Sequence, residues 1–176
     1  MKYSKIRKMD ISNGPGIRVS IFMQGCTFHC EGCFNPETWD FNEGIDFTDE
    51  TINEIMKLCE NQNIEGLSIL GGEPLHPKNI EGSTKLAKAF KEKFPKKNLW
   101  VWSGFLFEKL KDKEIFKYID VLVDGQFKIK LKNPKLKYCG SSNQRVIDVQ
   151  KSLKKKDLVF YYKNEEENSW KVGDLK

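Results

Sequence analysis

The stretch Ile17-Arg-Val-Ser-Ile-Phe-Met23 runs directly into Gln24-Gly25-Cys26-Thr-Phe-His-Cys30-Glu-Gly-Cys33. Its apolar and β-branched residues predict a buried strand, and Asn13-Gly-Pro-Gly16 predicts the turn that precedes it. Three cysteines therefore lie on one short loop at the carboxyl end of a strand. In parallel α/β proteins this is the edge at which ligands bind.

Downstream of this loop, the apolar residues alternate between strand-like and helical patterns. Strands are predicted at 67–70, 98–102 and 119–123, with further candidates at 146–149 and 158–162. Helices are predicted at 52–59, with Thr48 as N-cap, and at 86–94, ended by Pro95, with helical turns between 107 and 119. Strands that alternate with helices favour right-handed βαβ units and a mainly parallel sheet.

Each predicted strand is followed by glycines or by polar residues that can bind a ligand or take part in chemistry. The first leads to Cys26, the second to Gly71-Gly72-Glu73-Pro74, the third to Ser103-Gly104 and the fourth to Asp124-Gly125. Because parallel strands end at the same edge of a sheet, we expect these groups to meet there.

Length and composition describe an ordinary domain. With 176 residues the chain suits a single domain, and its 13 Gly and 6 Pro are close to average usage, which excludes collagen-like and low-complexity classes. Its net charge of +5 is mild. No apolar stretch is long enough to span a membrane, and no signal peptide is visible. The lysines are interleaved with acids, so direct nucleic-acid binding is not expected. These features predict a cytoplasmic protein.

The cysteines carry the chemistry. Five is an odd number, and three fall in the spacing C-x3-C-x2-C at Cys26, Cys30 and Cys33, which suits metal ligation in a reducing compartment rather than disulfides. Three thiolates can hold three irons of a [4Fe-4S] cluster and leave the fourth iron open. The alternatives are a Cys3His zinc site that uses His29, or three thiols with no common role. Cys59 lies on the apolar face of its helix and is interpreted as a buried thiol, whereas Cys139 is isolated and is not expected to be a fourth ligand.

Several further motifs accompany this spacing in order. They are Asn13-Gly-Pro-Gly-Ile-Arg18, Cys33-Phe-Asn-Pro-Glu-Thr-Trp39, Gly71-Gly-Glu-Pro-Leu75, Val121-Leu-Val-Asp-Gly125 and Gly140-Ser-Ser-Asn-Gln-Arg145. With them the sequence resembles the radical S-adenosylmethionine (SAM) enzymes, and within these the glycyl-radical activases of anaerobic ribonucleoside-triphosphate reductase. The resemblance covers about residues 10–149. It implies one radical SAM domain over 1–176, built as a partial TIM-like β/α barrel, with a C-terminal extension at 150–176 of unknown role.

The resemblance also implies an activity. Cys26, Cys30 and Cys33 would ligate the cluster, and SAM would bind its open iron. Reductive cleavage of SAM would give a 5′-deoxyadenosyl radical, which takes a hydrogen from a glycine of the reductase. A one-electron donor such as flavodoxin or ferredoxin is implied as a second partner, because the chain shows no reductant domain of its own.

Cofactor contacts follow from the matched motifs. Gly71, Gly72, Glu73 and Pro74 fit recognition of the SAM amino group, with Glu73 supplying the negative charge. Phe34 either packs on adenine or belongs to the core, and Asn35 either contacts adenosine or closes an Asx-turn. Gly32 replaces the aromatic residue that many members carry before the third cysteine, which moves the stacking role to Phe34.

Other candidates have a structural alternative of equal weight. Ser103 and Asp124 either contact the ribose, hold a cation near the SAM carboxylate, or form turns. Arg18 either offsets the charge of the cluster or the SAM carboxylate, or forms a strand-surface salt bridge. Asn143, Gln144 and Arg145 lie in a polar loop that faces either SAM or the reductase.

Two other kinds of function remain open from the sequence. One is a different radical SAM enzyme, either a small-molecule enzyme similar to 7-carboxy-7-deazaguanine synthase or another glycyl-radical activase. The other is a non-catalytic module built on structural zinc, which leaves the Gly71–Pro74 motif unexplained.

Overall fold

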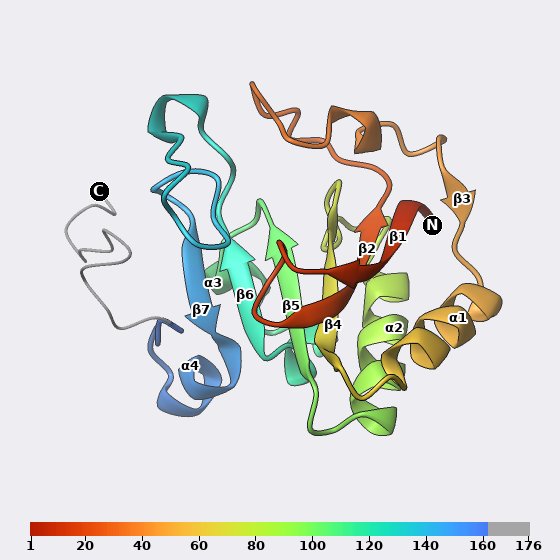
Figure 1. Cartoon of the computed structure of the whole chain (residues 1–176). Coiled ribbons are helices and arrows are strands. Elements are labelled where there is room, and N and C mark those ends of the chain that lie inside the picture. The colour runs from red at the N-terminus through yellow and green to blue at the C-terminus, as the bar shows by residue number, and fades with distance from the viewer. Residues whose placement is uncertain (162–176) are drawn as a thin grey trace.

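A computed structural model describes residues 1–161 of the chain, which share one seven-stranded sheet in the order β3-β1-β2-β4-β5-β6-β7 (Figure 1). The strands are β1 (Lys2–Asp10), β2 (Ile17–Met23), β3 (Ile45–Asp46), β4 (Ile64–Gly71), β5 (Asn98–Ser103), β6 (Val121–Asp124) and β7 (Arg145–Asp148). The helices are α1 (Asp49–Cys59), α2 (Ile80–Lys93), α3 (Phe107–Leu110) and α4 (Val149–Lys155), with 3-10 turns η1 (Pro36–Thr38), η2 (Glu114–Lys117) and η3 (Ile129–Leu131).

The centre of the sheet is parallel, as predicted. β2 pairs with β4, β4 with β5 and β5 with β6 in parallel, whereas β1 and β7 flank this centre in antiparallel orientation. The sheet is not closed, since its order runs from β3 to β7 without returning. The structure therefore confirms a mixed α/β fold with an open sheet, and the partial barrel remains an expectation of the family resemblance.

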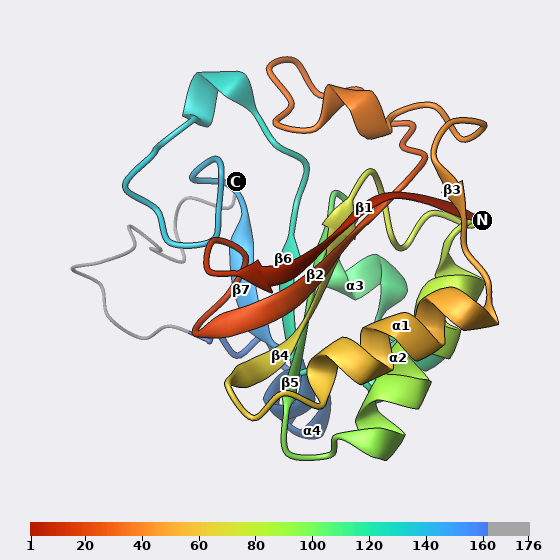
Figure 2. The same cartoon turned by 45° about the vertical axis from the view of Figure 1, so that its right-hand side comes forward.

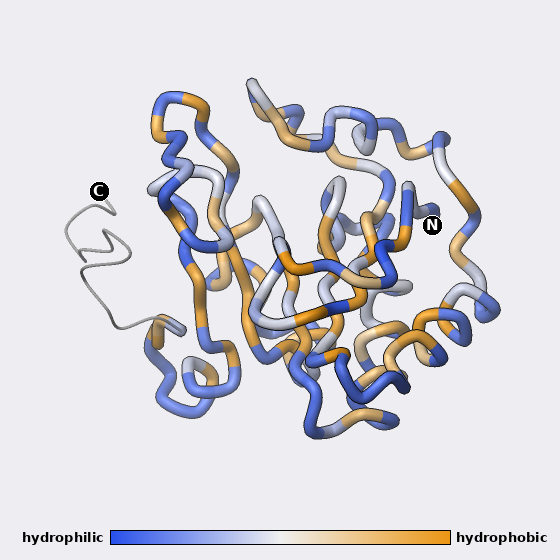
Figure 3. Tube along the Cα trace, viewed as in Figure 1, coloured by the Kyte–Doolittle hydropathy of each residue, from blue (hydrophilic) through white to orange (hydrophobic). Residues whose placement is uncertain are grey.

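The helices cover one face of this sheet. Side chains from α1 to α4 and from alternate positions of β2, β4, β5 and β6 form one continuous core, which includes Ile55, Leu86 and Phe90. Figure 2 shows α1, α2 and α3 on one side of the sheet, and in Figure 3 the trace of the central strands carries orange, hydrophobic stretches. On the opposite face Trp100, Val123 and Val146 form a smaller cluster. Because both faces are covered, the central strands read as near-continuous apolar runs in the sequence.

The parallel centre brings the strand ends together. Met23 at the end of β2 lies opposite Gly71 of β4, and Ser103 at the end of β5 lies opposite Asp124 of β6. The expectation that the chemically capable residues meet at one edge is thus confirmed. The cysteine loop and the loop after β6 both rise from this edge (Figure 1).

The sequence-based prediction lacks β3 and α4, and two further differences have a clear physical reason. β1 was not predicted because Lys2–Asp10 is mostly polar, and it forms a strand by pairing with β2 rather than by burying an apolar stripe. The candidate strand at 158–162 is reduced to an isolated bridge between Ile147 and Phe160, and Tyr162 lies outside the described residues. Within residues 1–161, no helix combines the length and apolar character needed to cross a membrane.

Candidate functional site

The cysteine loop is closed by backbone hydrogen bonds to the turn that follows it. Gly25 N–H donates to Thr38 O (2.8 Å) and Cys26 N–H donates to Trp39 O (3.0 Å). Inside the loop, Cys33 N–H donates to Cys30 O (3.1 Å). The three cysteines are thereby held on a compact loop at the carboxyl end of β2.

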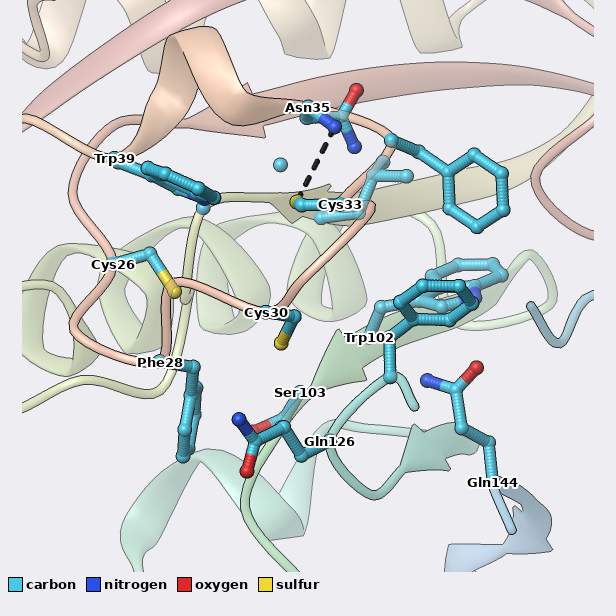
Figure 4. A pocket seen from close by; sticks show the side chains of 16 residues that line it. Cys26, Phe28, Cys30, Cys33, Asn35, Trp39, Trp102, Ser103, Gln126 and Gln144 are labelled. Carbon is cyan, nitrogen blue, oxygen red and sulfur yellow. Dashed lines mark hydrogen bonds between the residues drawn. The ribbon is translucent and has the colours of Figure 1, made fainter. Parts of the chain in front are cut away.

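The three thiols face one cavity (Figure 4). Burial raises the pKa of the Cys26 and Cys30 thiols, and Cys33 Sγ accepts a hydrogen bond from Asn35 N–H (3.4 Å). Thiols with raised pKa values must lose their protons to bind metal, so loading of this site releases protons.

Strand ends and aromatic rings form the walls of this cavity. The end of β4 contributes Leu70, Gly71 and Gly72, and the end of β5 contributes Trp102, Ser103 and Gly104. The remaining lining comes from loops: Phe28, Phe34, Asn35, Trp39, Gln126, Phe127 and Gln144. A cavity lined by aromatic rings with a few convergent polar groups is typical of a ligand site.

The cavity contains many of the residues that the sequence singled out. All three cysteines line it, together with Phe34, Asn35, Gly71, Gly72, Ser103 and Gln144. The remaining candidates lie outside its lining: Arg18, Gly32, Glu73, Pro74, Asp124, Asn143 and Arg145. Phe34 is 60% exposed at the mouth and packs on Phe127, with ring centroids 5.1 Å apart.

The Glu73 side chain is buried between the ends of β4 and β5 and does not line the cavity. Its side chain is 1% exposed, and its carboxylate accepts hydrogen bonds from Ser103 Oγ (2.8 Å), Gly104 N–H (2.7 Å) and Leu75 N–H (2.8 Å). Burial raises the pKa of Glu73 to about 7, although these three donors favour the charged form. The carboxylate therefore fixes the end of β4 against the end of β5.

This burial makes stability depend on pH. Between the ordinary pKa of 4.5 and the folded value of about 7, the folded protein keeps a proton that the unfolded chain has released. Stability from this group is present at low pH and is lost as pH rises through that window, by on the order of 1–3 kcal/mol. Glu73→Gln is expected to remove this loss, measured as the difference in urea unfolding free energy of the apoprotein between pH 4.5 and pH 7.5. An unchanged difference in the variant would contradict the assignment.

Asp124 belongs to a buried ion-pair network. Arg145 Nε donates to Asp124 Oδ1 (2.8 Å), and its Nη1 and Nη2 donate to the Glu108 carboxylate (2.9 and 2.8 Å). Burial lowers the pKa of Arg145, but the bonds to Asp124 and Glu108 outweigh it and raise that pKa. The network joins β6, β7 and α3 directly after Gln144, which lines the cavity.

The loop before Arg145 is clamped by Gln144. Its Oε1 accepts from Gly140 N–H (2.8 Å) and Ser141 N–H (3.2 Å), and its Nε2 donates to Gly125 O (2.9 Å). Asn143 donates to Gln126 O (2.9 Å). The polar motif at 140–145 thus ties two loops together beside the cavity.

Arg18 lies at the other end of β2 from the cysteines and is buried, so neither of its predicted roles, beside the cluster or in a strand-surface salt bridge, is what the structure shows. The side chain is fully buried and donates to Ser68 Oγ (2.7 Å), Asn98 Oδ1 (2.7 Å) and Leu67 O (2.9 Å). Burial lowers its pKa to about 10. Its hydrogen bonds join β2, β4 and β5. The sequence did not predict this position, because Arg18 begins the same strand whose carboxyl end carries the cysteine loop.

Sequence reasoning missed several lining residues. Phe28 and Gln126 were not singled out, and neither were the rings of Trp39, Trp102 and Phe127. Trp102 precedes Ser103 at a strand end, and Phe28 lies between Cys26 and Cys30, so their positions in the sequence could have indicated both. Gln126 and Phe127 enter from a loop whose path only the tertiary fold defines.

The other candidate ligands point elsewhere. The ring of His29 stacks on Trp39, with centroids 4.5 Å apart. Cys59 is fully buried on α1, as predicted, and Cys139 is buried in the smaller cluster. Within residues 1–161, no three Cys, His, Asp or Glu side chains converge as ligands of a single metal ion. The fit of an iron–sulfur cluster rests on the donors: three thiols that face one cavity.

Comparisons with known proteins point in the same direction. The 4Fe-4S single cluster domain family matches residues 12–147. A protein of enterobacteria phage T4 named anaerobic ribonucleoside-triphosphate reductase-activating protein is 42% identical over 146 residues, which cover 83% of this chain and 93% of that protein. Proteins of the same name from Escherichia coli K12 (39% over 150 residues, 83% and 97% covered) and Vibrio cholerae (37% over 148 residues, 82% and 96%) are similar along the same length.

Proposed function

The chain belongs to the family of anaerobic ribonucleoside-triphosphate reductase-activating proteins, and from this premise we propose that it activates such a reductase by radical SAM chemistry. The observation that carries the proposal is the cavity itself, in which three thiols from one loop face the ends of β4 and β5. A site with three cluster ligands leaves one iron open, which suits a cofactor-binding cluster rather than one that only stores electrons.

Cys26, Cys30 and Cys33 would hold the [4Fe-4S] cluster. Their thiolates are the soft ligands that such clusters prefer. Asn35 N–H, which donates to Cys33 Sγ, would remain as a hydrogen bond to a ligand sulfur and would influence the cluster's reduction potential. The reduced cluster would supply one electron to bound SAM, whose C–S bond would break to give methionine and a 5′-deoxyadenosyl radical. That radical would take a hydrogen atom from a glycine of the reductase and leave as 5′-deoxyadenosine.

The walls of the cavity would bind and orient SAM. Gly71 and Gly72 present bare backbone on one side, and Ser103 and Gly104 do so on the other. Gly71 has a φ of +106°, and a side chain at Gly72 would meet Gly25 O at 2.6 Å, so both positions require glycine. The rings of Phe34 and Trp102 offer apolar surfaces for an adenine, and they help to keep water from a radical.

Glu73 would act as a positioning residue in this proposal. Its carboxylate is engaged by Ser103, Gly104 and Leu75, so it would set the spacing between the two backbone walls rather than contact the SAM ammonium group. Asp124 and Arg145 would do the same for the loop that carries Gln144.

The experiment that tests the proposal is reductive SAM cleavage. The protein is reconstituted anaerobically with iron and sulfide, reduced with dithionite and mixed with SAM, and 5′-deoxyadenosine and methionine are measured by chromatography. The proposal predicts both products in equal amounts and none without the cluster. A reconstituted protein that binds zinc in place of the cluster and leaves SAM intact would contradict it.

A further inference from the structure

The positive charge of the chain is concentrated beside the candidate site. Between Asp124 and Asp148 the sequence carries six basic residues and no Asp or Glu, whereas the whole chain has a net charge of +5. The remaining residues are therefore close to neutral. Five of the six are lysines in the segment 128–137, which follows β6.

Four of these lysines form a surface that we call the lysine loop: Lys128, Lys130, Lys132 and Lys135. All four are exposed. None of them forms an ion pair with a carboxylate within the part of the chain that the structure describes. By contrast, Arg145 forms ion pairs with Asp124 and Glu108. Unpaired surface lysines this close together raise the local potential and attract an acidic partner.

The lysine loop packs against the cysteine loop. A side chain at Gly32, between Cys30 and Cys33, would meet Ile129 Cδ1 at 2.8 Å. The ammonium group of Lys132 lies 5.5 Å from the ring centroid of Phe34, which directly follows Cys33. Figure 2 shows the two loops at the same end of the sheet. A partner seated on these lysines would therefore lie next to the thiols.

We propose that the lysine loop docks an acidic one-electron donor protein, which delivers its electron to the cluster through this side of the site. The inference rests on the proposed function, because only a cluster that must be reduced requires a donor. In the step the donor's carrier loses one electron, the cluster gains one, and no bond forms or breaks between the two proteins.

The character of the surface favours a donor over the protein substrate. Electron-transfer complexes are transient, bury little surface and are steered together by charge. Exposed lysines around an exposed apolar side chain such as Phe34 match this kind of interface. A substrate loop must instead enter the cavity, so its affinity would come mainly from apolar burial within it. Docking of the reductase on the lysine loop is accordingly an outcome that the test must be able to detect.

The test compares two triple variants of the reconstituted full-length protein. Lys128→Gln, Lys130→Gln and Lys135→Gln neutralise the lysine loop and leave Lys132 on Phe34. Lys88→Gln, Lys154→Gln and Lys155→Gln remove the same charge from exposed positions on α2 and α4. Cluster reduction by an acidic flavodoxin in its reduced form is followed by stopped-flow absorbance. The lysine-loop variant is expected to react about tenfold more slowly at low salt, with the difference shrinking at high salt, while the control stays within about twofold of the unmodified protein.

Dithionite separates this inference from the proposed function. With dithionite all three proteins should cleave SAM equally, because a small reductant needs no docking surface. Absence of SAM cleavage in the unmodified protein would count against the proposed function, whatever the flavodoxin rates. Equal flavodoxin rates in the two variants would overturn the docking surface. So would a lysine-loop variant that accepts electrons normally but, with dithionite, forms the glycyl radical on the reductase more slowly, because the surface would then dock the reductase.

Discussion

Cys30→Ala is expected to abolish binding of the [4Fe-4S] cluster while leaving the fold intact. Cys30 lies in the middle of the cysteine loop and lines the cavity with only two other thiols. Two ligands do not hold a cluster that already leaves one iron without a protein ligand. Because Cys30 is partly exposed and supports no core cluster, its loss removes little packing.

The matched control is Cys59→Ala, which removes a thiol from α1 on the far side of the sheet. Bound iron and sulfide and the visible absorbance of the cluster are measured after anaerobic reconstitution, with circular dichroism as the measure of folding. Cys30→Ala should lose the cluster signal with unchanged circular dichroism, and Cys59→Ala should keep it. Full cluster content in Cys30→Ala would contradict the ligand assignment.

Arg145→Met is expected to cost about 3–5 kcal/mol of unfolding free energy at pH 7, since it leaves a buried carboxylate without its partner. Asp124 is fully buried, and burial raises its pKa against the effect of Arg145. Without the guanidinium that pKa should rise further. The folded variant would then hold a proton that the unfolded chain releases, so the loss should be smaller at pH 4 than at pH 7.

The double variant Arg145→Met with Asp124→Leu tests whether an uncompensated charge is the cause. Replacing both partners by apolar residues should recover much of the loss, because no buried charge is left unpaired. Urea unfolding of the apoprotein at both pH values gives the comparison. If the single and double variants are equally unstable at pH 7, lost packing rather than the buried carboxylate explains the effect.

The parallel centre of the sheet and the position of the cysteine loop could be predicted from the sequence, because both depend on local patterns. Ile17–Met23 and Leu67–Leu70 are buried on both faces, so their apolar runs are unambiguous. The antiparallel strand β1 was not predictable in this way, since its residues are mostly polar and it is held as a strand by its pairing with β2.

The candidate site also divides into features that local sequence patterns predict and features that depend on tertiary contacts. The thiols and glycines were found because their spacing is specific, whereas the roles of the charged residues depend on tertiary contacts. The sequence predicts that Glu73 faces a ligand, but its carboxylate instead holds the ends of β4 and β5 together. Arg18 forms its hydrogen bonds at the other end of β2 from the cysteine loop. The overall charge does not reveal the lysine loop, because a net charge of +5 over 176 residues is mild and does not show that nearly all of it lies in one segment.

The most direct measurement is electron paramagnetic resonance on the anaerobic mixture of reconstituted protein, SAM, reductant and an anaerobic ribonucleoside-triphosphate reductase. We predict a glycyl-radical signal on the reductase that requires SAM and is absent when Cys30→Ala replaces the unmodified protein. Cleavage of SAM with no radical on the reductase would contradict the assignment of that reductase as the substrate.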